Sequence, residues 1–231
     1  MASSRVKRNT SPSQSNLDLT KPQTFVTITV GQGKFVQDFV MHKSFLTHYS
    51  PFFRSAFNRP FFDRSNQSMK VENVSREVFG LVHHWIYLQQ LPSLPLEAPS
   101  LENLAKVWLA AEHFKIPALQ NHASYALCDR LSRSEGSIKM RGGVPVLNNR
   151  FDDYLACIKH IYFSTPAGEH VLKLLVLDIF PYKQIAYADR IEDFPIAFCQ
   201  DVTRLLAKRA PASESWPVDR KPRFTVQEDL S

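Results

Sequence analysis

The stretch that decides the fold is FVMHKSFLTHYSPFFRSAFNRPFFD, residues 39–63, in which eight of the 25 side chains are aromatic. The eight are Phe39, Phe45, Tyr49, Phe52, Phe53, Phe57, Phe61 and Phe62. The rings at positions 45, 49, 53 and 57 recur every four residues, which is the spacing of one face of a helix. A surface that stacks nucleic-acid bases instead needs exposed rings on a sheet or along a groove. The spacing therefore favours a buried stripe over a base-stacking surface, and we expect no nucleic-acid partner.

Two strands are expected just before this helical spacing begins. Val26, Ile28 and Val30 alternate with two threonines, which predicts a half-buried strand. Gly31-Gln-Gly33 predicts a tight hairpin turn, because glycine adopts positive φ without a steric penalty. The returning strand is expected over residues 34–41.

The residues after this hairpin predict two short helices. His42 and Lys43 stand where the second strand gives way to helical spacing. Ser50 suits an N-cap, since its side chain can accept a hydrogen bond from a free backbone N–H of the next helix. Pro51 suits the first helical position, where its missing N–H costs nothing.

The chain then alternates between one more strand and longer helices. Residues 67–73 predict a short third strand, and residues 75–91 predict an amphipathic helix with Ser75 as its cap. Ser100 is expected to cap a further helix, and Pro117 to open the one after it.

These blocks, in this order, resemble the BTB/POZ domain. The pattern F-x-x-H-K-x-x-L is formed by Phe39, His42, Lys43 and Leu46, and SPFFRSAF adds Ser50, Pro51 and Phe53. The helix EVFGLVHHWIY and the hairpin LENLAKVWLAAEHFKIPALQNHA follow at the expected distances. The resemblance covers about residues 22–133 and implies an α+β fold, a short mixed β-sheet flanked by a helical cluster. The chain looks most like the single-BTB proteins of filamentous fungi.

The resemblance implies a protein-interaction module with no catalytic residues, cofactor or metal. Such domains self-associate, or act as substrate adaptors that dock onto the cullin scaffold of ubiquitin ligases. The adaptors dock through a hydrophobic-x-acidic motif after the second short helix, and here Phe61, Phe62 and Asp63 occupy that place. The family motif usually ends in Glu, one methylene longer. Two readings stay open: a docking motif that recruits a cullin for an unknown client, or two rings that cover the sheet edge in an oligomerising scaffold without a ligase role.

Two departures from the family concern the repressor and dimerising branches. In BTB repressors an acid before the first strand pairs with the basic residue after the motif histidine, but here that position is Phe25. Because a buried, unpaired Lys43 would be costly, we expect its ammonium group to reach solvent or another acid. Dimerising families also carry a helix before the first strand, which residues 15–19 hardly supply.

The remaining segments divide the chain further. Residues 1–21 and 209–231 read as disordered tails, with a transit peptide as the alternative for the Arg- and Ser-containing start. Residues 134–150 lose periodicity and carry three of the seven glycines, which predicts a linker. Residues 151–208 predict a small all-α extension with helices from about 151, 168–180 and 195–208.

The bulk properties exclude several classes of protein. The net charge of +6 is spread over tails, linker and core rather than concentrated in a stripe, which argues against a nucleic-acid footprint. No apolar run reaches the roughly 18 to 20 residues that a membrane-spanning helix needs. Three cysteines without CxxC spacing suit a reducing compartment, so we expect the cytoplasm, the nucleus or both.

Catalytic and metal-binding roles for the eight histidines are disfavoured. His42 holds the place of a structural histidine in the family, and no triad spacing surrounds it. His83 and His84 point about 100° apart on their helix and lack an i+4 ligand partner. We therefore expect no enzyme, and a metal or cofactor in the purified protein would reopen that question.

Overall fold

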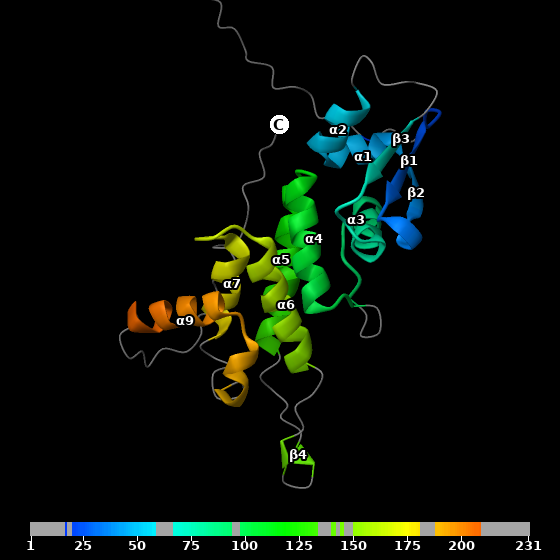
Figure 1. Ribbon diagram of the computed structural model, residues 1–231. Coiled ribbons are helices and arrows are strands. Elements are labelled where there is room, and N and C mark those ends of the chain that lie inside the picture. Colours follow the sequence, from blue (N-terminus) through cyan, green and yellow to red (C-terminus); the bar gives the residue numbers. More distant parts are fainter. Residues whose placement is uncertain are drawn as a thin grey trace, which may run out of the picture.

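The computed structural model describes residues 17, 20–58, 67–93, 98–133, 140–141, 144–145, 150–180 and 188–208. Its three-stranded sheet has the order β2-β1-β3, with β1 (Phe25–Val30) in the centre (Figure 1). Strand β2 (Gln37–His42) pairs antiparallel with β1, and β3 (Ser68–Val71) pairs parallel with it. The expected short mixed sheet is confirmed. The three inward side chains of β1 are at most 1% exposed, as their alternation predicts.

The prediction of a tight hairpin turn at residues 31–33 is wrong. Strand β2 begins only at Gln37, and the connection contains the 3-10 turn η1 (Gly33–Phe35). Gly31 takes φ +94°, and a Cβ there would lie 2.5 Å from the carbonyl oxygen of Phe35. The chain therefore folds back over Gly31 before it enters β2, which lengthens the turn.

Serine caps begin three of the helices of the N-terminal part. The helices of this part are α1 (Lys43–Tyr49), α2 (Pro51–Phe57), α3 (Arg76–Leu88), α4 (Leu101–His113) and α5 (Pro117–Arg133). Each capping serine accepts, through its hydroxyl oxygen, the backbone N–H of the residue three positions later. The pairs are Ser50 with Phe53 in α2 at 3.1 Å, Ser75 with Val78 in α3 at 3.3 Å, and Ser100 with Asn103 in α4 at 3.0 Å. The three predicted caps are confirmed. Helix α3 ends earlier than expected, because Gln89 adopts the left-handed conformation at φ +53°.

Within the described residues, three α-helices follow in the C-terminal extension. They are α6 (Arg150–Ser164), α7 (Val171–Ile179) and α9 (Ile196–Lys208), with the 3-10 segment η4 (Ala188–Asp193) before α9. Their bounds agree with the three predicted patterns. Within the stretch expected to be a linker, two-residue strands β4 (Met140–Arg141) and β5 (Val144–Pro145) pair antiparallel.

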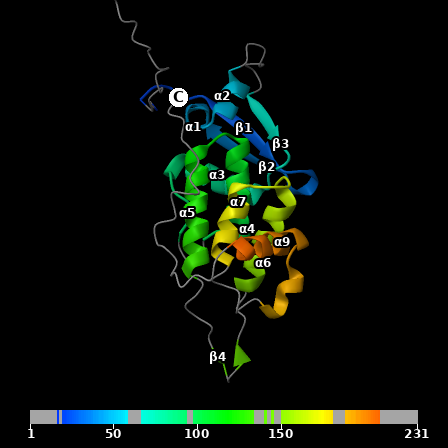
Figure 2. The same cartoon turned by 90° about the vertical axis from the view of Figure 1, so that its left-hand side faces the viewer.

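Helix α4 lies at the centre of the molecule. Figure 1 shows the sheet and α3 at one end, α4 and α5 in the middle, and α6, α7 and α9 beyond them. In the turned view of Figure 2 the sheet lies across one end of the helical bundle. Seven of the thirteen residues of α4 are buried, on the sides that face α3, α5 and α6. One buried cluster therefore runs without a break from Val26 in the sheet to Val202 in α9.

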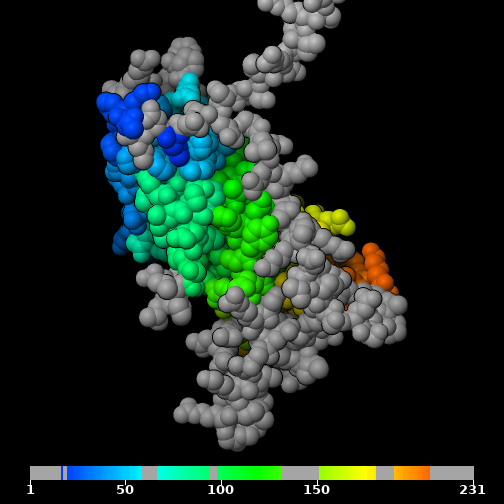
Figure 3. All heavy atoms as spheres, turned by 180° about the vertical axis from the view of Figure 1, so that it is seen from behind, coloured from blue at the N-terminus to red at the C-terminus, as the bar shows by residue number. Residues whose placement is uncertain are grey.

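From behind, the sheet and helices α3 to α5 form a continuous surface, with α7 and α9 visible at one side (Figure 3). Within the described residues, no helix combines the length and apolarity that crossing a membrane requires.

Candidate protein-interaction site

The junction between β2 and α1 is built around His42. The phenol oxygen of Tyr87 in α3 accepts the backbone N–H of His42 at 3.0 Å and lies 2.9 Å from its Nδ1. The Phe25 ring covers the imidazole at a centroid distance of 4.5 Å. The imidazole thus ties the end of the sheet to α3, the structural role that the resemblance implies.

Lys43 is held by a backbone carbonyl rather than by an acid. Its Nζ donates a hydrogen bond to the carbonyl oxygen of Phe57, the last residue of α2, at 3.1 Å. We expected its ammonium group to reach solvent or another acid; Lys43 is only half-buried, and its partner among the described residues is this carbonyl rather than an acid. The ammonium group lies at the negative end of the α2 dipole and satisfies one of the carbonyls left without an intrahelical partner there.

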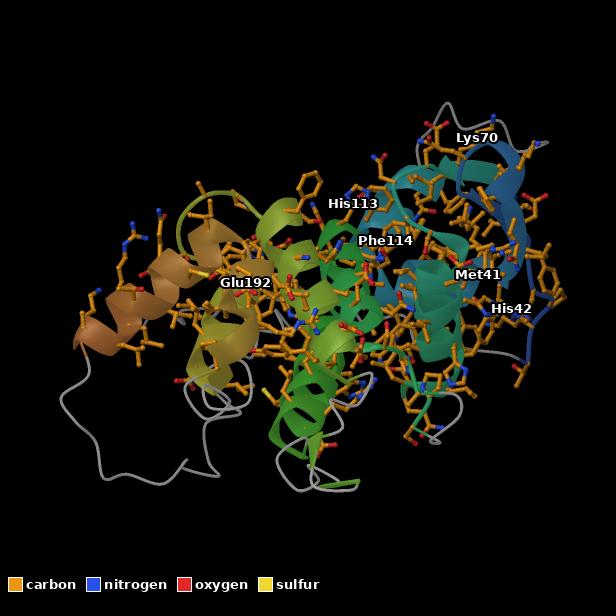
Figure 4. The ribbon with its side chains drawn as sticks, turned by 60° about the horizontal axis from the view of Figure 1, so that its bottom comes forward. Met41, His42, Lys70, His113, Phe114 and Glu192 are labelled. Carbon is orange, nitrogen blue, oxygen red and sulfur yellow. The ribbon has the colours of Figure 1, made fainter. Side chains whose placement is uncertain are left out.

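Ser50 joins the two short helices to α4. Its hydroxyl donates to the carbonyl oxygen of Phe114 at 2.6 Å while it caps α2, and the side chain is fully buried. Figure 4 places Phe114 and His113 where α4 ends against the α1–α2 pair. Phe53 packs on the Phe114 ring at 4.9 Å, and Leu46 is also fully buried.

The aromatic stripe is core, but it is divided between two helices. Phe53 and Phe57 on α2 are at most 3% exposed, while Phe45 and Tyr49 on α1 are half-buried against the same cluster. Phe39 packs against the ring of Phe79 in α3 at 4.9 Å. The described rings of the opening stretch therefore stabilise the domain rather than offer a stacking surface.

The predicted docking residues Phe61, Phe62 and Asp63 lie outside the described residues. Two described features lie next to them in the chain. Helix α2 ends at Phe57 with its final carbonyl held by Lys43, and the exposed Asn58 follows.

The histidine and cysteine side chains considered for catalysis or metal binding lie in packed surroundings. His83 lies against Phe39 and Tyr87, and burial lowers the pKa of its imidazole. Among the described residues no three His, Cys, Asp or Glu side chains gather where they could hold a metal ion. Cys157 is fully buried, and burial raises the pKa of its thiol well above the usual range, so the thiolate that a nucleophile needs is disfavoured.

Asp153 links the extension to the domain, a role that sequence reasoning missed. Asp152 and Asp153 both stand in the first turn of α6. The Asp153 carboxylate, however, also accepts the backbone N–H of Leu101 at 2.9 and 3.1 Å, so it caps α4 from another helix. Arg130 of α5 lies 3.4 Å from the same carboxylate. One side chain of α6 therefore holds the first turn of α4 and the end of α5.

Comparison with known proteins gives the family. The sequence profile of the BTB/POZ domain family matches residues 17–131. Among solved structures, the BTB domain of zebrafish PATZ1 matches with 18% sequence identity and a TM-score of 0.35, over 45% of this chain and 75% of that chain. None of the curated proteins matches. The profile match covers the strands, the His42 junction and helices α1 to α5, so the chain contains a BTB/POZ domain, a protein-interaction module, followed by a helical extension.

Proposed function

We propose that this protein is a non-enzymatic substrate adaptor that docks onto a cullin-type ubiquitin ligase in the cytoplasm or nucleus. The BTB/POZ match over residues 17–131 carries the proposal, because the hydrophobic-x-acidic sequence Phe61-Phe62-Asp63 follows the second short helix of that domain in the sequence. In this role Phe61 supplies the apolar anchor and Asp63 a carboxylate for a polar partner at the rim. Aromatic anchors of this kind often dominate the energy of an interface.

The hydrogen bond of Lys43 supports this use of the segment. Because the ammonium group fixes the last carbonyl of α2, the chain leaves the helix from a defined point just before the motif. The Phe25 ring stands where BTB repressors keep an acid, and Lys43 has a partner of a different kind. Both features favour an adaptor over a repressor that recruits corepressors.

A pulldown with purified cullin tests the proposal. Phe61→Ala is expected to reduce the recovered cullin at least tenfold and Asp63→Ala severalfold, while Asp63→Glu, which restores the usual acid, should retain or increase it. Phe35→Ala and Glu72→Ala are matched controls, since both side chains are exposed at the sheet end of the domain. Failure of the wild-type chain to recover any cullin, or equal recovery by wild type and Phe61→Ala, would refute the adaptor.

The oligomeric state separates the adaptor from the alternative. An oligomer in light scattering that recovers no cullin would identify a scaffold without a ligase role. A chain that recovers cullin through Phe61 is an adaptor whether or not it self-associates.

A further inference from the structure

The two most exposed large hydrophobic side chains of the described residues both lie in the extension. Phe163 near the end of α6 is 93% exposed, and Ile196 at the start of α9 is 78% exposed. Phe163 is two residues beyond the buried Ile161, so it projects from the opposite side of the helix. Gathered apolar side chains of this kind on a protein surface mark interaction sites.

Phe163 borders a groove between the domain and the extension. The groove has a volume of about 590 Å³ and lies between α4, α6 and the first turn of α9. Its apolar lining is Ala156, Tyr162, Phe163, Pro195 and Ala197. A second hollow of about 520 Å³ is bordered by Ile196 and Glu192. Figure 4 labels Glu192, which lies far from the sheet. The exposed apolar surface thus continues across the start of α9.

The charges around the groove leave it positive. Among the described residues, the one acid that lines the groove is Glu102, and Lys106 neutralises it at 2.6 Å. Asp201 accepts from the Tyr162 hydroxyl and pairs with Arg204 at 2.8 Å. Lys159 is exposed in the groove, and within the described residues it has no acid in ion-pair range.

Helix α9 adds positive potential at the same place. It runs for thirteen residues, and no acidic residue stands in its first turn. The first intrahelical hydrogen bond is donated by Cys199 to Pro195, which leaves the N–H groups of residues 196–198 without an intrahelical acceptor. His160 adds no charge at neutral pH, because burial lowers the pKa of its imidazole. The groove therefore offers an apolar floor beside the ammonium group of Lys159 and a positive helix end.

We propose that this groove binds a short segment of a client protein in which apolar side chains stand next to a carboxylate. The apolar side chains lie against Phe163 and the alanines of α6 and α9, and the carboxylate faces Lys159 and the first turn of α9. The assignment of the occupant as a client rests on the proposed adaptor function. The described residues that line the groove belong to α4, α6 and α9, so the proposed client site uses residues other than the proposed scaffold motif.

A displayed library of random twelve-residue peptides, panned on the full chain, tests the groove directly. We expect selected peptides to share apolar residues beside Asp or Glu, and synthetic copies to bind in fluorescence anisotropy. Phe163→Ser and Lys159→Glu should each reduce the affinity for these peptides at least tenfold. Replacing the peptide carboxylate by lysine should restore binding to Lys159→Glu while it weakens binding to the wild type.

Matched substitutions at the other end of the molecule provide the controls. Lys70 is exposed on the edge strand β3 (Figure 4), and Phe35 is 69% exposed in the turn after β1. Phe35→Ser and Lys70→Glu should therefore leave peptide affinity within twofold. An empty selection, consensus peptides without a carboxylate, or equal binding to wild type and Phe163→Ser would overturn the proposal.

The cullin pulldown, repeated with Phe163→Ser, separates this proposal from the adaptor function. Unchanged cullin recovery together with lost peptide binding supports a client groove. Lost cullin recovery would make the groove a scaffold contact and overturn the client assignment. If the wild type recovers no cullin but binds the peptides through Phe163, the adaptor fails while the groove stands as a binding site.

Discussion

The BTB/POZ domain and the helical extension are each held by an aromatic cluster, but they use the rest of their apolar surface differently. In the domain, Phe53 and Phe114 pack at 4.9 Å beneath the α1–α2 pair. In the extension, Phe198 packs on Phe180 and Phe194 at 4.9 and 5.1 Å. Both parts also leave rings exposed, but in different settings: Phe35 of the domain is 69% exposed in the turn after β1, whereas Phe163 of the extension is 93% exposed on α6 and borders a groove. The difference suggests that the extension serves both to complete the core and to present a surface.

The largest expected effects come from opening either aromatic cluster. Phe79→Ala in the domain and Phe198→Ala in the extension each remove a fully buried ring, so each should cost about 3–5 kcal/mol of unfolding free energy. Because one buried cluster joins both parts, thermal unfolding of either variant should show one transition, shifted to lower temperature.

Calorimetry of the two variants beside Phe35→Ala checks this expectation. Phe35 is 69% exposed, so its substitution should change the unfolding free energy by less than about 0.5 kcal/mol. A separate early transition in Phe198→Ala, with the main transition unchanged, would show that the extension folds independently of the domain.

The serine caps should differ in importance according to burial. Ser50→Ala removes the cap of α2 and leaves the carbonyl of Phe114 without its donor in a buried place, so we expect a cost of about 2–3 kcal/mol. Ser75→Ala removes only an exposed cap of α3 and should cost about 1 kcal/mol. Urea unfolding of the two variants measures the difference, and equal costs would mean that the bond to Phe114 contributes nothing.

The contact between the two parts should depend on Asp153. Asp153→Ala removes the acceptor of the Leu101 N–H and the acid beside Arg130 but leaves the Ser100 cap of α4, so we expect a loss of about 1–2 kcal/mol. Asp153→Asn keeps an acceptor for Leu101 and should lose less. The neighbour Asp152 has a 73% exposed side chain, and Asp152→Ala should stay within about 0.5 kcal/mol of the wild type. Similar losses for both alanine variants in urea unfolding would contradict the role given to Asp153.

The comparison between the parts also explains which features the sequence could predict. Alternation in β1, the three serine caps and the helical stripes are local patterns, and they predict elements because each depends on neighbours within four residues. The partner of Lys43 could not be predicted in this way, since Phe57 lies fourteen residues away and offers a backbone carbonyl that any residue type would offer. The Asp153–Leu101 bond joins residues 52 positions apart, and a helix-start acid gives no sign of capping another helix.

The groove beside Phe163 shows the same limit, since local sequence patterns do not predict which helices meet. Phe163 breaks the apolar stripe of its helix, and that misplacement is a signal that could have marked it as a surface residue. The groove beside it needs α4, α6 and α9 together, which only the tertiary arrangement supplies. The length of the turn after β1 was missed because two glycines suit a tight turn and a longer turn equally well.

The smallest expected effect concerns pH, and it arises at the contact of the extension with α4. His170 accepts the N–H of Leu172 through Nδ1 as the cap of α7, and its ring lies 5.3 Å from that of Trp108 in α4. Burial lowers the pKa of His170, with Lys173 acting in the same direction and Glu112 against it. The unfolded chain, with an ordinary pKa near 6.5, therefore takes up the proton first, so stability present above about pH 7 falls on acidification.

His170→Asn should remove part of this pH dependence, because an amide oxygen can still accept the Leu172 N–H but does not titrate. We expect the drop in melting temperature between pH 7.5 and 5.5 to be smaller in the variant, by about 1 °C. His83 and His160 also have pKa values lowered by burial, so the variant should keep a residual drop. Only the neutral imidazole can cap α7. An equal drop in the melting temperatures of wild type and variant would therefore show that protonation of this cap does not contribute to the pH dependence of stability.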